Sequence, residues 1–327
     1  DGIDGLAVAE LASPEPLRGQ VKVRIRASSI NARDYNTVRD PKARNLTLPF
    51  VPNSDGAGEV ISVGDGVTRF REGDRVVTCF FARWPAGGID DDVMASALGG
   101  AEPGVLAEEV VLDEGALVHI PDHLTFPEAA TLTCAAVTAW NGLVARGGLK
   151  AGDSVLLLGT GGVSVFALQF ATMFGAQAIV TSKSDEKLSR AREMGAWQTI
   201  NYATTPGWEK TVKDLTGGRG VDHVVEVGGP GTLQKSIEAV RTGGNIAMIG
   251  VLTRGEIDPL PMMRRSLRLN GIYVGSRAMF EDMNAAISAN EMRPVIDRTF
   301  GFDDTPDAYR YMQSAAHFGK IVIDFDK

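Results

Sequence analysis

The amino-acid sequence predicts an α/β protein in which a β-rich domain accompanies a doubly wound parallel sheet. Period-two alternation of apolar residues, typical of strands, dominates the first 124 residues. From residue 152 onward, short apolar strands alternate with helical segments, as they do in parallel sheets with helices on both faces. A glycine-rich turn at residues 159–162 joins the first of these strands to the first of these helices. Dinucleotide-binding units begin in this way.

The β-rich domain is recognised by several short strand patterns. The alternation in Val21–Ala27 predicts a half-buried strand, and Gly64–Gly66 is a turn signal further along. Trp84–Gly104 has few periodic apolar positions and is predicted to be a long loop, whereas 127–145 has a helical pattern. The other strands of this domain are expected at 56–63, 73–79, 105–112 and 117–120.

The parallel sheet is predicted from the regular spacing of its elements. A tail from residue 283 to 327 adds one or two helices and a last strand at 320–325, which we expect to return to the first domain. The predicted domains are therefore 1–124 with 277–327, and 125–276. Strands are expected at 154–158, 178–181, 199–202, 221–227, 246–249 and 269–274, and helices at 163–174, 185–194, 208–215 and 233–240.

Composition limits the function. A chain of 327 residues is long enough for two domains, and its net charge of −8 argues against nucleic acid or an anionic membrane as partner. No apolar run reaches the roughly 18 residues of a membrane helix. Two cysteines, Cys79 and Cys134, form no disulfide framework and suit the reducing cytoplasm. The chain begins at Asp1 without a methionine, which leaves a preceding segment open.

The glycine turn carries the cofactor prediction. The first two glycines of a G-x-G-x-x-G fingerprint are present, and Ser164 stands at the third position. In such a unit the turn approaches a pyrophosphate, which the helix N-terminus faces. Ligands bind at the carboxyl ends of the strands, near Gly159, Ser182, Gly228 and Gly250. The predicted pyrophosphate turn consists of Gly159, Thr160, Gly161, Gly162 and Val163.

The end of the second strand indicates which dinucleotide binds. NAD sites usually place a carboxylate there for the ribose 2′-hydroxyl, but this chain has Ser182 and Lys183, with Lys187 one helical turn later. A hydroxyl and ammonium groups suit a 2′-phosphate, so NADP(H) is the predicted cofactor. Two alternatives stay open. Ser184 could simply cap the following helix, and Asp185 could serve NAD if the strand ends later.

The order of several motifs resembles the medium-chain dehydrogenase/reductase superfamily. They read GAGEV, REGDRV, CAAVTAW, LLLGTGGV, EMGA, INY and HFGKIVI. This resemblance implies a GroES-like catalytic domain, a Rossmann domain, an active site in the cleft between them, hydride transfer involving a nicotinamide, and a homodimer paired through the strand near 269–274. It also implies that Thr138, Val163, Gly250 and Val251 lie near the nicotinamide, and Tyr202 and Lys320 near the adenosine phosphate.

The chain departs from the zinc-containing members of that family. Those members carry a Cys, a His-Glu pair and a Cys or Asp in three segments where this chain has Asn31, Ser54-Asp55 and Cys134. Catalytic zinc takes three such protein ligands, and only Asp55 and Cys134 suit it. Two cysteines also cannot form a four-cysteine structural site. We therefore predict a protein without zinc.

A reductase of enones or quinones is the first predicted function. Without a metal, the developing enolate or phenolate oxygen needs only hydrogen-bond donors. The segment from Asn31 to Tyr35 resembles the N-x-x-D segment of zinc-independent quinone and enone reductases. We expect Asn31 to bind the substrate oxygen, Tyr35 to act as donor or gate, and Asp34 to order the loop. Asn31 could instead be a turn residue that satisfies its own backbone.

The substrate is expected to be a small apolar carbonyl compound or quinone. Phe50 and Trp84 are candidates for lining its pocket. The glycine turn has the shorter length of the alcohol dehydrogenase branch, which favours a second hypothesis, a zinc-less alcohol or aldehyde oxidoreductase. A third hypothesis is a protein that binds the nucleotide without turnover.

Overall fold

The computed structural model describes residues 2–250 and 254–327 and divides into two compact units. Unit 1 comprises Asp1–Val137 and Gly275–Lys327, and unit 2 comprises Thr138–Val274. The first division therefore follows residue 137, later than the expected 124. Helix α3 (Phe126–Ala130) accounts for this difference, because it packs against strands β1, β2 and β13 of unit 1.

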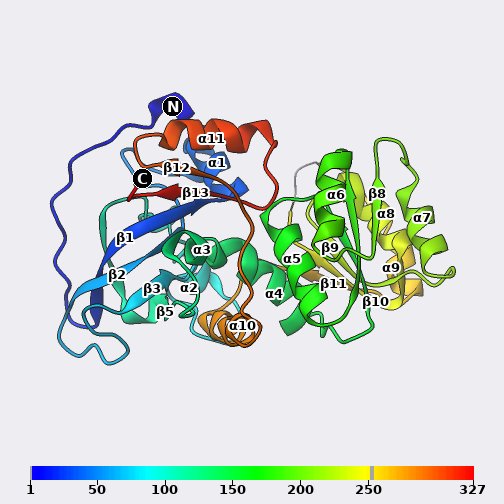
Figure 1. The fold of residues 1–327 in the computed structure, drawn as a ribbon, viewed down its shortest axis with the longest axis horizontal. Coiled ribbons are helices and arrows are strands. Elements are labelled where there is room, and N and C mark those ends of the chain that lie inside the picture. The colour runs from blue at the N-terminus through cyan, green and yellow to red at the C-terminus, as the bar shows by residue number, and fades with distance from the viewer. Residues whose placement is uncertain (1, 251–253) are drawn as a thin grey trace. The chain divides into compact units, whose positions relative to one another are not determined.

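Unit 1 is built on a sheet that has seven strands in the described part of the chain, in the order β12-β13-β1-β2-β3-β5, with β4 paired to β1 (Figure 1). Strand β13 runs antiparallel to β1, with Ile30 opposite Ile321, which confirms that the last strand returns to the first domain. The strands are β1 (Gln20–Ile30), β2 (Asp55–Val63), β3 (Arg75–Thr78), β4 (Glu109–Asp113), β5 (Leu117–His119), β12 (Ile296–Gly301) and β13 (Lys320–Asp324).

Apolar alternation places the core of unit 1. Val21, Val23 and Ile25 of β1 pack with Val60 of β2 and Val76 of β3. The predicted loop at residues 84–104 is irregular apart from α2, a single helical turn. The helices of this unit are α1 (Ala32–Arg39), α2 (Asp91–Met94), α3, α10 (Arg277–Ala289) and α11 (Thr305–Ser314), with 3-10 turns at Ile3–Gly5, Lys42–Arg44 and Glu114–Ala116.

Unit 2 contains the doubly wound sheet, all parallel, in the order β11-β10-β9-β6-β7-β8. The chain moves outward from β6 in one direction and then from β9 in the other, so the strand order reverses between β6 and β9. Its strands are β6 (Ser154–Leu158), β7 (Gln177–Ser182), β8 (Gln198–Asn201), β9 (Val221–Glu226), β10 (Val240–Met248) and β11 (Arg268–Gly271). Its helices are α5 (Gly162–Met173), α6 (Asp185–Glu193), α7 (Trp208–Leu215), α8 (Pro230–Ala239) and α9 (Leu260–Arg264).

The helical pattern predicted at 127–145 is not one regular helix. Helix α3 is followed by a π-helical turn at Leu132–Ala136, by α4 (Val137–Trp140) and by a second π-helical turn at Asn141–Ala145. Such turns are rare and occur often at functional sites. The first of them carries Cys134. Across the described residues, no helix is long and apolar enough to cross a membrane.

Candidate active site and cofactor edge

The turn after β6 is formed by backbone alone. Gly159 adopts φ 75°, a left-handed conformation that favours glycine. Gly161 is the N-cap of α5, and no side chain caps the helix there. A Cβ added at Gly161 would meet no atom within 4 Å. The N-terminus of α5 therefore keeps its positive dipole end clear of capping groups, which suits a pyrophosphate.

Ser164, which replaces the third glycine of the fingerprint, fits between the helix and the strand. Its side chain is buried, and its Oγ donates a hydrogen bond of 2.7 Å to the carbonyl oxygen of Leu158. Leu158 is the last residue of β6. The hydroxyl thus ties the helix to the strand at the position where glycine normally permits close packing. Thr160 is buried in the turn, and Val163 is half-buried in the first turn of α5.

The carboxyl end of β7 presents hydroxyl and ammonium groups. The strand ends at Ser182, and the backbone N–H of Tyr202 donates to the Ser182 carbonyl at 3.1 Å, which places Tyr202 beside it. Lys183 is exposed next to Ser182. Ser184 accepts a hydrogen bond of 3.3 Å from the N–H of Lys187, so its expected role as the cap of α6 is confirmed.

Asp185 lies beyond the end of that strand, in the first turn of α6. Its Oδ1 accepts a hydrogen bond of 2.8 Å from the side chain of Asn201. The strand does not extend to Asp185, and the carboxylate is already bonded within the protein. The alternative in which Asp185 follows the strand end directly is therefore not supported by the fold.

The carboxyl ends of β9 and β10 are held together by Glu226, a buried residue that sequence reasoning missed. Its Oε1 accepts from the N–H of Gly228 at 2.8 Å, the N–H of Gly229 at 3.1 Å and the hydroxyl of Thr232 at 2.6 Å. Its Oε2 accepts from Ser236. An acidic residue closing an apolar strand was the only signal available for it.

Glu226 also holds Gly250, the other glycine predicted at the carboxyl ends of these strands. Its backbone carbonyl accepts from the N–H of Gly250 at 3.2 Å. A Cβ at Gly250 would lie 2.0 Å from the carbonyl oxygen of Val227, so this position requires glycine. Val251, predicted to lie near the nicotinamide, falls outside the described residues. Thr138 is buried at the start of unit 2.

Asn31 and Asp34 meet at the start of α1 in unit 1. The backbone N–H of Asn31 donates to Asp34 Oδ2 at 2.9 Å, and its side-chain Nδ2 donates to the same oxygen at 3.1 Å. The Asn31 side chain is only 8% exposed, and its Oδ1 accepts a bond of 2.6 Å from Lys320 Nζ. Both ends of this amide are thus bonded to other side chains, and Asn31 is also the N-cap of α1, where it forms a capping box with Asp34.

Lys320 therefore lies in unit 1, whereas the resemblance associated it with the adenosine phosphate. Its side chain is 3% exposed, and its ammonium also donates to the carbonyl oxygen of Ile30 at 3.0 Å. Asp55 Oδ2 is 3.6 Å from the same nitrogen. This ammonium is surrounded by protein oxygen atoms.

Asp55 is fully buried and accepts hydrogen bonds from Ser54 at 2.7 Å and from Ser29 at 3.3 Å. Burial raises the pKa of Asp55, the charge of Lys320 opposes this rise, and the neighbouring Asp34 adds to it. A hydrogen bond from Asn31 also lowers the pKa of Asp55. The pKa of the Cys134 thiol is raised first by burial and then by the charge of Asp55. Asn31, Asp34, Asp55 and Lys320 form one cluster, which we call the buried polar cluster.

The remaining predicted residues are less closely joined to that cluster. Tyr35 follows Asn31 by one helical turn and is half-buried, with the Arg39 guanidinium 5.5 Å from its ring centroid. Trp84 is only 2% exposed, packs edge-on against Phe81 and donates to the Gly87 carbonyl at 3.2 Å. Phe50 is half-buried.

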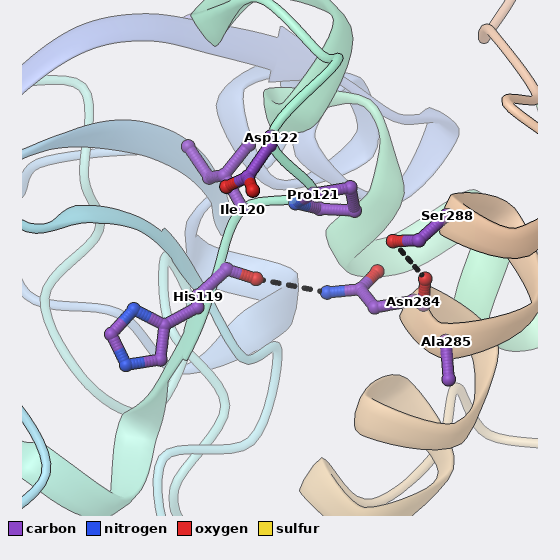
Figure 2. Close-up of a pocket in the computed structure, with 7 residues that line it drawn as sticks. All are labelled: His119, Ile120, Pro121, Asp122, Asn284, Ala285 and Ser288. Carbon is purple, nitrogen blue, oxygen red and sulfur yellow. Dashed lines mark hydrogen bonds between the residues drawn. The ribbon is translucent and has the colours of Figure 1, made fainter.

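Two surface cavities of unit 1 involve none of the predicted site residues. One, of about 270 Å³, lies between the end of β5 and α10 (Figure 2). There Asn284 Nδ2 donates to the His119 carbonyl at 3.1 Å, and Ser288 donates to the Asn284 carbonyl at 2.8 Å. The other, of about 520 Å³, lies between β12 and α11 and is lined by residues that include Arg298 and Phe300.

Comparison with known proteins assigns the family. The model of the alcohol dehydrogenase GroES-like domain matches residues 17–122, and the model of the zinc-binding dehydrogenases matches residues 162–289. A zinc-type alcohol dehydrogenase-like protein of Schizosaccharomyces pombe is 46% identical over 99% of this chain and 96% of its own length. The chain belongs to the medium-chain dehydrogenase/reductase superfamily. Members of this family are nicotinamide-dependent oxidoreductases, so the predicted family, reaction class and fold are confirmed.

Other members similar to this medium-chain dehydrogenase/reductase have different reactions in their names. A 2-methylene-furan-3-one reductase of Solanum lycopersicum is 31% identical over 96% of this chain and 74% of its own length. The quinone oxidoreductase of Homo sapiens is 25% identical over 96% of this chain and 92% of its own. Among solved structures, one from Sinorhizobium meliloti 1021 with an alcohol dehydrogenase name shares 43% identity, with a TM-score of 0.90, over 95% of this chain and 92% of its own. An NAD-dependent alcohol dehydrogenase shares 33% identity, with a TM-score of 0.90, over 99% of this chain and 97% of its own.

The names of the matched model and of the first relative raise the question of zinc. Throughout residues 2–250 and 254–327, no three or more His, Cys, Asp or Glu side chains are grouped so that they could hold a metal ion. Asp55 already accepts bonds from two serines and lies beside the Lys320 ammonium. The donor set of this medium-chain dehydrogenase/reductase therefore does not fit a catalytic zinc ion.

Proposed function

We propose that this protein is an NADPH-dependent reductase that transfers a hydride to an enone or quinone without a metal. The observation that carries the cofactor assignment is the carboxyl end of β7. Ser182, Lys183 and Tyr202 stand there together, and Asp185 is bonded to Asn201. A carboxylate at this place would repel a 2′-phosphate, whereas an ammonium and hydroxyl groups would bind it.

Different residues of unit 2 would bind different parts of the cofactor. The backbone turn from Gly159 to Gly162 and the N-terminus of α5 would hold the pyrophosphate. Lys183 would pair with the 2′-phosphate, with Lys187 nearby in the first turn of α6. Gly228 and Gly250 would border the nicotinamide, where a Cβ at Gly250 could not fit. Once bound, NADPH supplies a hydride to the electrophilic carbon of the substrate.

Residues of unit 1 would stabilise the negative charge that develops on the substrate oxygen. The amide of Asn31 bonds to Asp34 and Lys320 and contributes a hydrogen bond to Asp55. We therefore assign direct contact with the oxygen to the Tyr35 hydroxyl, and assign Asn31 to holding the start of α1 in place. A donor aimed at an enolate or phenolate stabilises the transition state without a metal. Solvent water supplies the proton that completes the reduction.

The apolar character of the substrate follows from the aromatic residues of unit 1. Phe50 is half-buried and remains our candidate for contact with the substrate. Trp84 packs against Phe81 and would support such a pocket from behind. The names of the tomato and human relatives, an enone-type reductase and a quinone oxidoreductase, support this substrate class.

A zinc-less alcohol or aldehyde oxidoreductase is the second candidate. The short glycine turn favours it, as do the alcohol dehydrogenase names of the two structural neighbours. Enones, quinones, aldehydes and alcohols should be tested with NADPH, NADH and the oxidised cofactors. Faster reduction of enones or quinones with NADPH is the expected result. Turnover of alcohols and aldehydes alone would overturn the proposal, and binding of NADPH without any turnover would indicate a nucleotide-binding protein.

The cofactor assignment has its own test in Lys183→Ala, with Lys210→Ala, an exposed lysine on α7, as the matched control. A charge-assisted hydrogen bond contributes about 1.5–3 kcal/mol when fully formed. Because Lys183 is exposed, we expect a loss near the lower limit. The Kd for NADPH should rise roughly tenfold, and the Kd for NADH should change less than twofold. Equal losses for both cofactors would refute the assignment.

We also infer a homodimer and a cytoplasmic location. Strand β11 is the edge of the parallel sheet, and three large apolar side chains that flank it in the sequence are exposed: Leu260 and Met263 on α9, and Tyr273 after the strand. Pairing of this edge with a second copy would cover them. Cys79 and Cys134 are free thiols, as is usual in the reducing cytoplasm. Fractionation of cells that express the native protein would test the location, and recovery outside the cytosol would contradict it.

A further inference from the structure

The buried polar cluster of unit 1 contains its own cation. The Lys320 ammonium is 2.6 Å from Asn31 Oδ1, 3.0 Å from the Ile30 carbonyl oxygen and 3.6 Å from Asp55 Oδ2. Its side chain is almost fully buried. Three oxygen atoms of different kinds thus converge on one positive charge in the interior of the unit.

The charges of the cluster balance. Asp34 and Asp55 are both fully buried, and a buried charge is costly unless it is paired. Arg33 pairs with Asp34 at 3.0 Å, where it also donates to the carbonyls of Leu98 and Gly99. Lys320 is the cation beside Asp55. Each of the two carboxylates therefore has one cation near it.

The same ammonium determines how the Asn31 amide is turned. An ammonium only donates and a carboxylate only accepts, so the amide oxygen must face Lys320 and the amide nitrogen must face Asp34. Either contact alone would select this orientation. The backbone carbonyl of Asn31 accepts a hydrogen bond of 3.2 Å from the N–H of Tyr35, which connects the cluster to the residue that we assign to the substrate oxygen.

We propose that Lys320 is the internal cation of this site and occupies the place of a divalent metal, and that it is a positioning residue for the start of α1. The family names imply zinc, whereas the donors that surround Asp55 here are hydroxyl groups and an ammonium. A divalent cation at Asp55 would have to displace a buried positive charge. The positioning of Tyr35 rests on the proposed reductase function, and the exclusion of metal does not.

The test compares Lys320→Met, Asp55→Asn, the double variant Lys320→Met/Asp55→Asn and Lys320→Arg. Methionine keeps much of the length of lysine without its charge. Lys22→Met is the matched control, because Lys22 is only 8% exposed, pairs with Glu109 at 3.1 Å and lies on β1. Unfolding in urea, metal content by mass spectrometry, and kcat and KM for NADPH and substrate are measured for each protein.

Charge compensation predicts a coupled pair. Lys320→Met should raise the unfolding equilibrium constant by about two orders of magnitude or more, as expected when one partner of a buried pair is lost. The double variant should recover much of this loss, since Asp55→Asn removes the uncompensated charge. Additive losses would overturn the role in charge compensation. Full unfolding of the single variant with a folded double variant would support it.

If Lys320 positions the start of α1, its replacement should change kcat but not the KM for NADPH. In Lys320→Met and in the double variant, kcat should fall about 10- to 100-fold, because the Asn31 oxygen lacks its hydrogen bond from the Lys320 ammonium in both. The KM for NADPH should be unchanged, and Lys320→Arg should restore part of kcat. A rise in the KM for NADPH with normal kcat would show that Lys320 binds the cofactor and would refute the positioning role.

Metal content completes the test. Wild-type protein purified with added Zn²⁺ and then dialysed should hold much less than one zinc ion per chain. One tightly held zinc ion per wild-type chain would overturn the proposal. If the wild type reduces no enone or quinone, the proposed function fails, and the metal and stability measurements still decide the role of Lys320.

Discussion

Glu226 offers the most direct test of how the fold builds the carboxyl edge of the parallel sheet, where we propose that the cofactor binds. Its carboxylate accepts four hydrogen bonds, two from the backbone N–H groups of Gly228 and Gly229 and two from the hydroxyls of Thr232 and Ser236. Its backbone carbonyl binds the N–H of Gly250. Replacement by alanine removes the acceptor for the loop after β9 and leaves the strand itself unchanged.

The size of the effect follows from these contacts. The hydroxyl of Thr232 lies 3.3 Å from the Gly229 carbonyl, so it has another acceptor, and the Ser236 hydroxyl can turn to a new partner. Gly228 is half-buried, so its N–H can turn to water, whereas Gly229 is buried and its N–H has no such freedom. A buried donor without a partner costs about 1–3 kcal/mol, so Glu226→Ala should lower the free energy of unfolding by about 1–3 kcal/mol. Glu226→Gln keeps an oxygen for the backbone donors and should cost about 1–2 kcal/mol.

Ligand affinities distinguish a disturbance of the loop after β9 from unfolding of the whole unit. Strands β9 and β10 lie on one side of β6, and β7 lies on the other. Glu226→Ala should therefore weaken NADPH roughly tenfold, an effect of about 1.4 kcal/mol, but should leave the Kd for 2′,5′-ADP within about twofold. Glu238→Ala, at an exposed position of α8, is the control. Calorimetric titration and urea unfolding measure both quantities. Unchanged stability, or equal losses for the two ligands, would refute the reasoning.

Two further predictions concern the buried carboxylate of Asp222 and the edge of the parallel sheet. Burial alone would raise the pKa of Asp222, but hydrogen bonds from Arg219, the Ser154 backbone and Arg241 hold it well below the ordinary value. The stabilisation that ionised Asp222 gives the folded protein is complete above the pKa of this group in the unfolded chain, about 4, and is lost as the pH falls toward its pKa in the folded protein. Asp222→Asn should therefore lower the free energy of unfolding, measured in urea, by about 2 kcal/mol at pH 7 and by less at pH 3. An equal cost at both pH values would contradict this origin. Met263→Asp, which charges a side chain of α9 that is 70% exposed, should convert the proposed dimer to monomer in sedimentation experiments, and a wild-type monomer would exclude the proposed pairing.

Local patterns were sufficient to predict most of the fold. The strand at 154–158 and the helix at 208–215 have the predicted limits, because their apolar patterns and end signals are local. Strand β12 (Ile296–Gly301) was not predicted, since its residues alternate poorly and its conformation depends on pairing with β13. The predicted strand at 105–112 begins only at Glu109, because the N–H of Val105 bonds to the Asn53 carbonyl and holds the chain in a loop.

The grouping of the strand ends at one edge of the parallel sheet was predictable for a topological reason. Parallel strands end at one edge of the sheet, so the residues after β6, β7, β9 and β10 could be grouped before any coordinates were known. Their internal bonds could not be predicted. The pairing of Asn201 with Asp185 joins residues 16 positions apart on different elements, and it depends on the register of β7 with β8.

The buried polar cluster shows why a motif does not determine what a side chain does. Asn31 and Lys320 are 289 positions apart, and they meet because Ile30 stands opposite Ile321 where β1 and β13 pair (Figure 1). This register holds for any residue at either position. The pairing of amide oxygen with ammonium exists only because asparagine stands at 31 and lysine at 320. The chemistry of the site is therefore a joint property of two distant positions. Replacing Asn31 by alanine or Lys320 by methionine should remove it, and the register of β1 with β13 would still bring the two positions together.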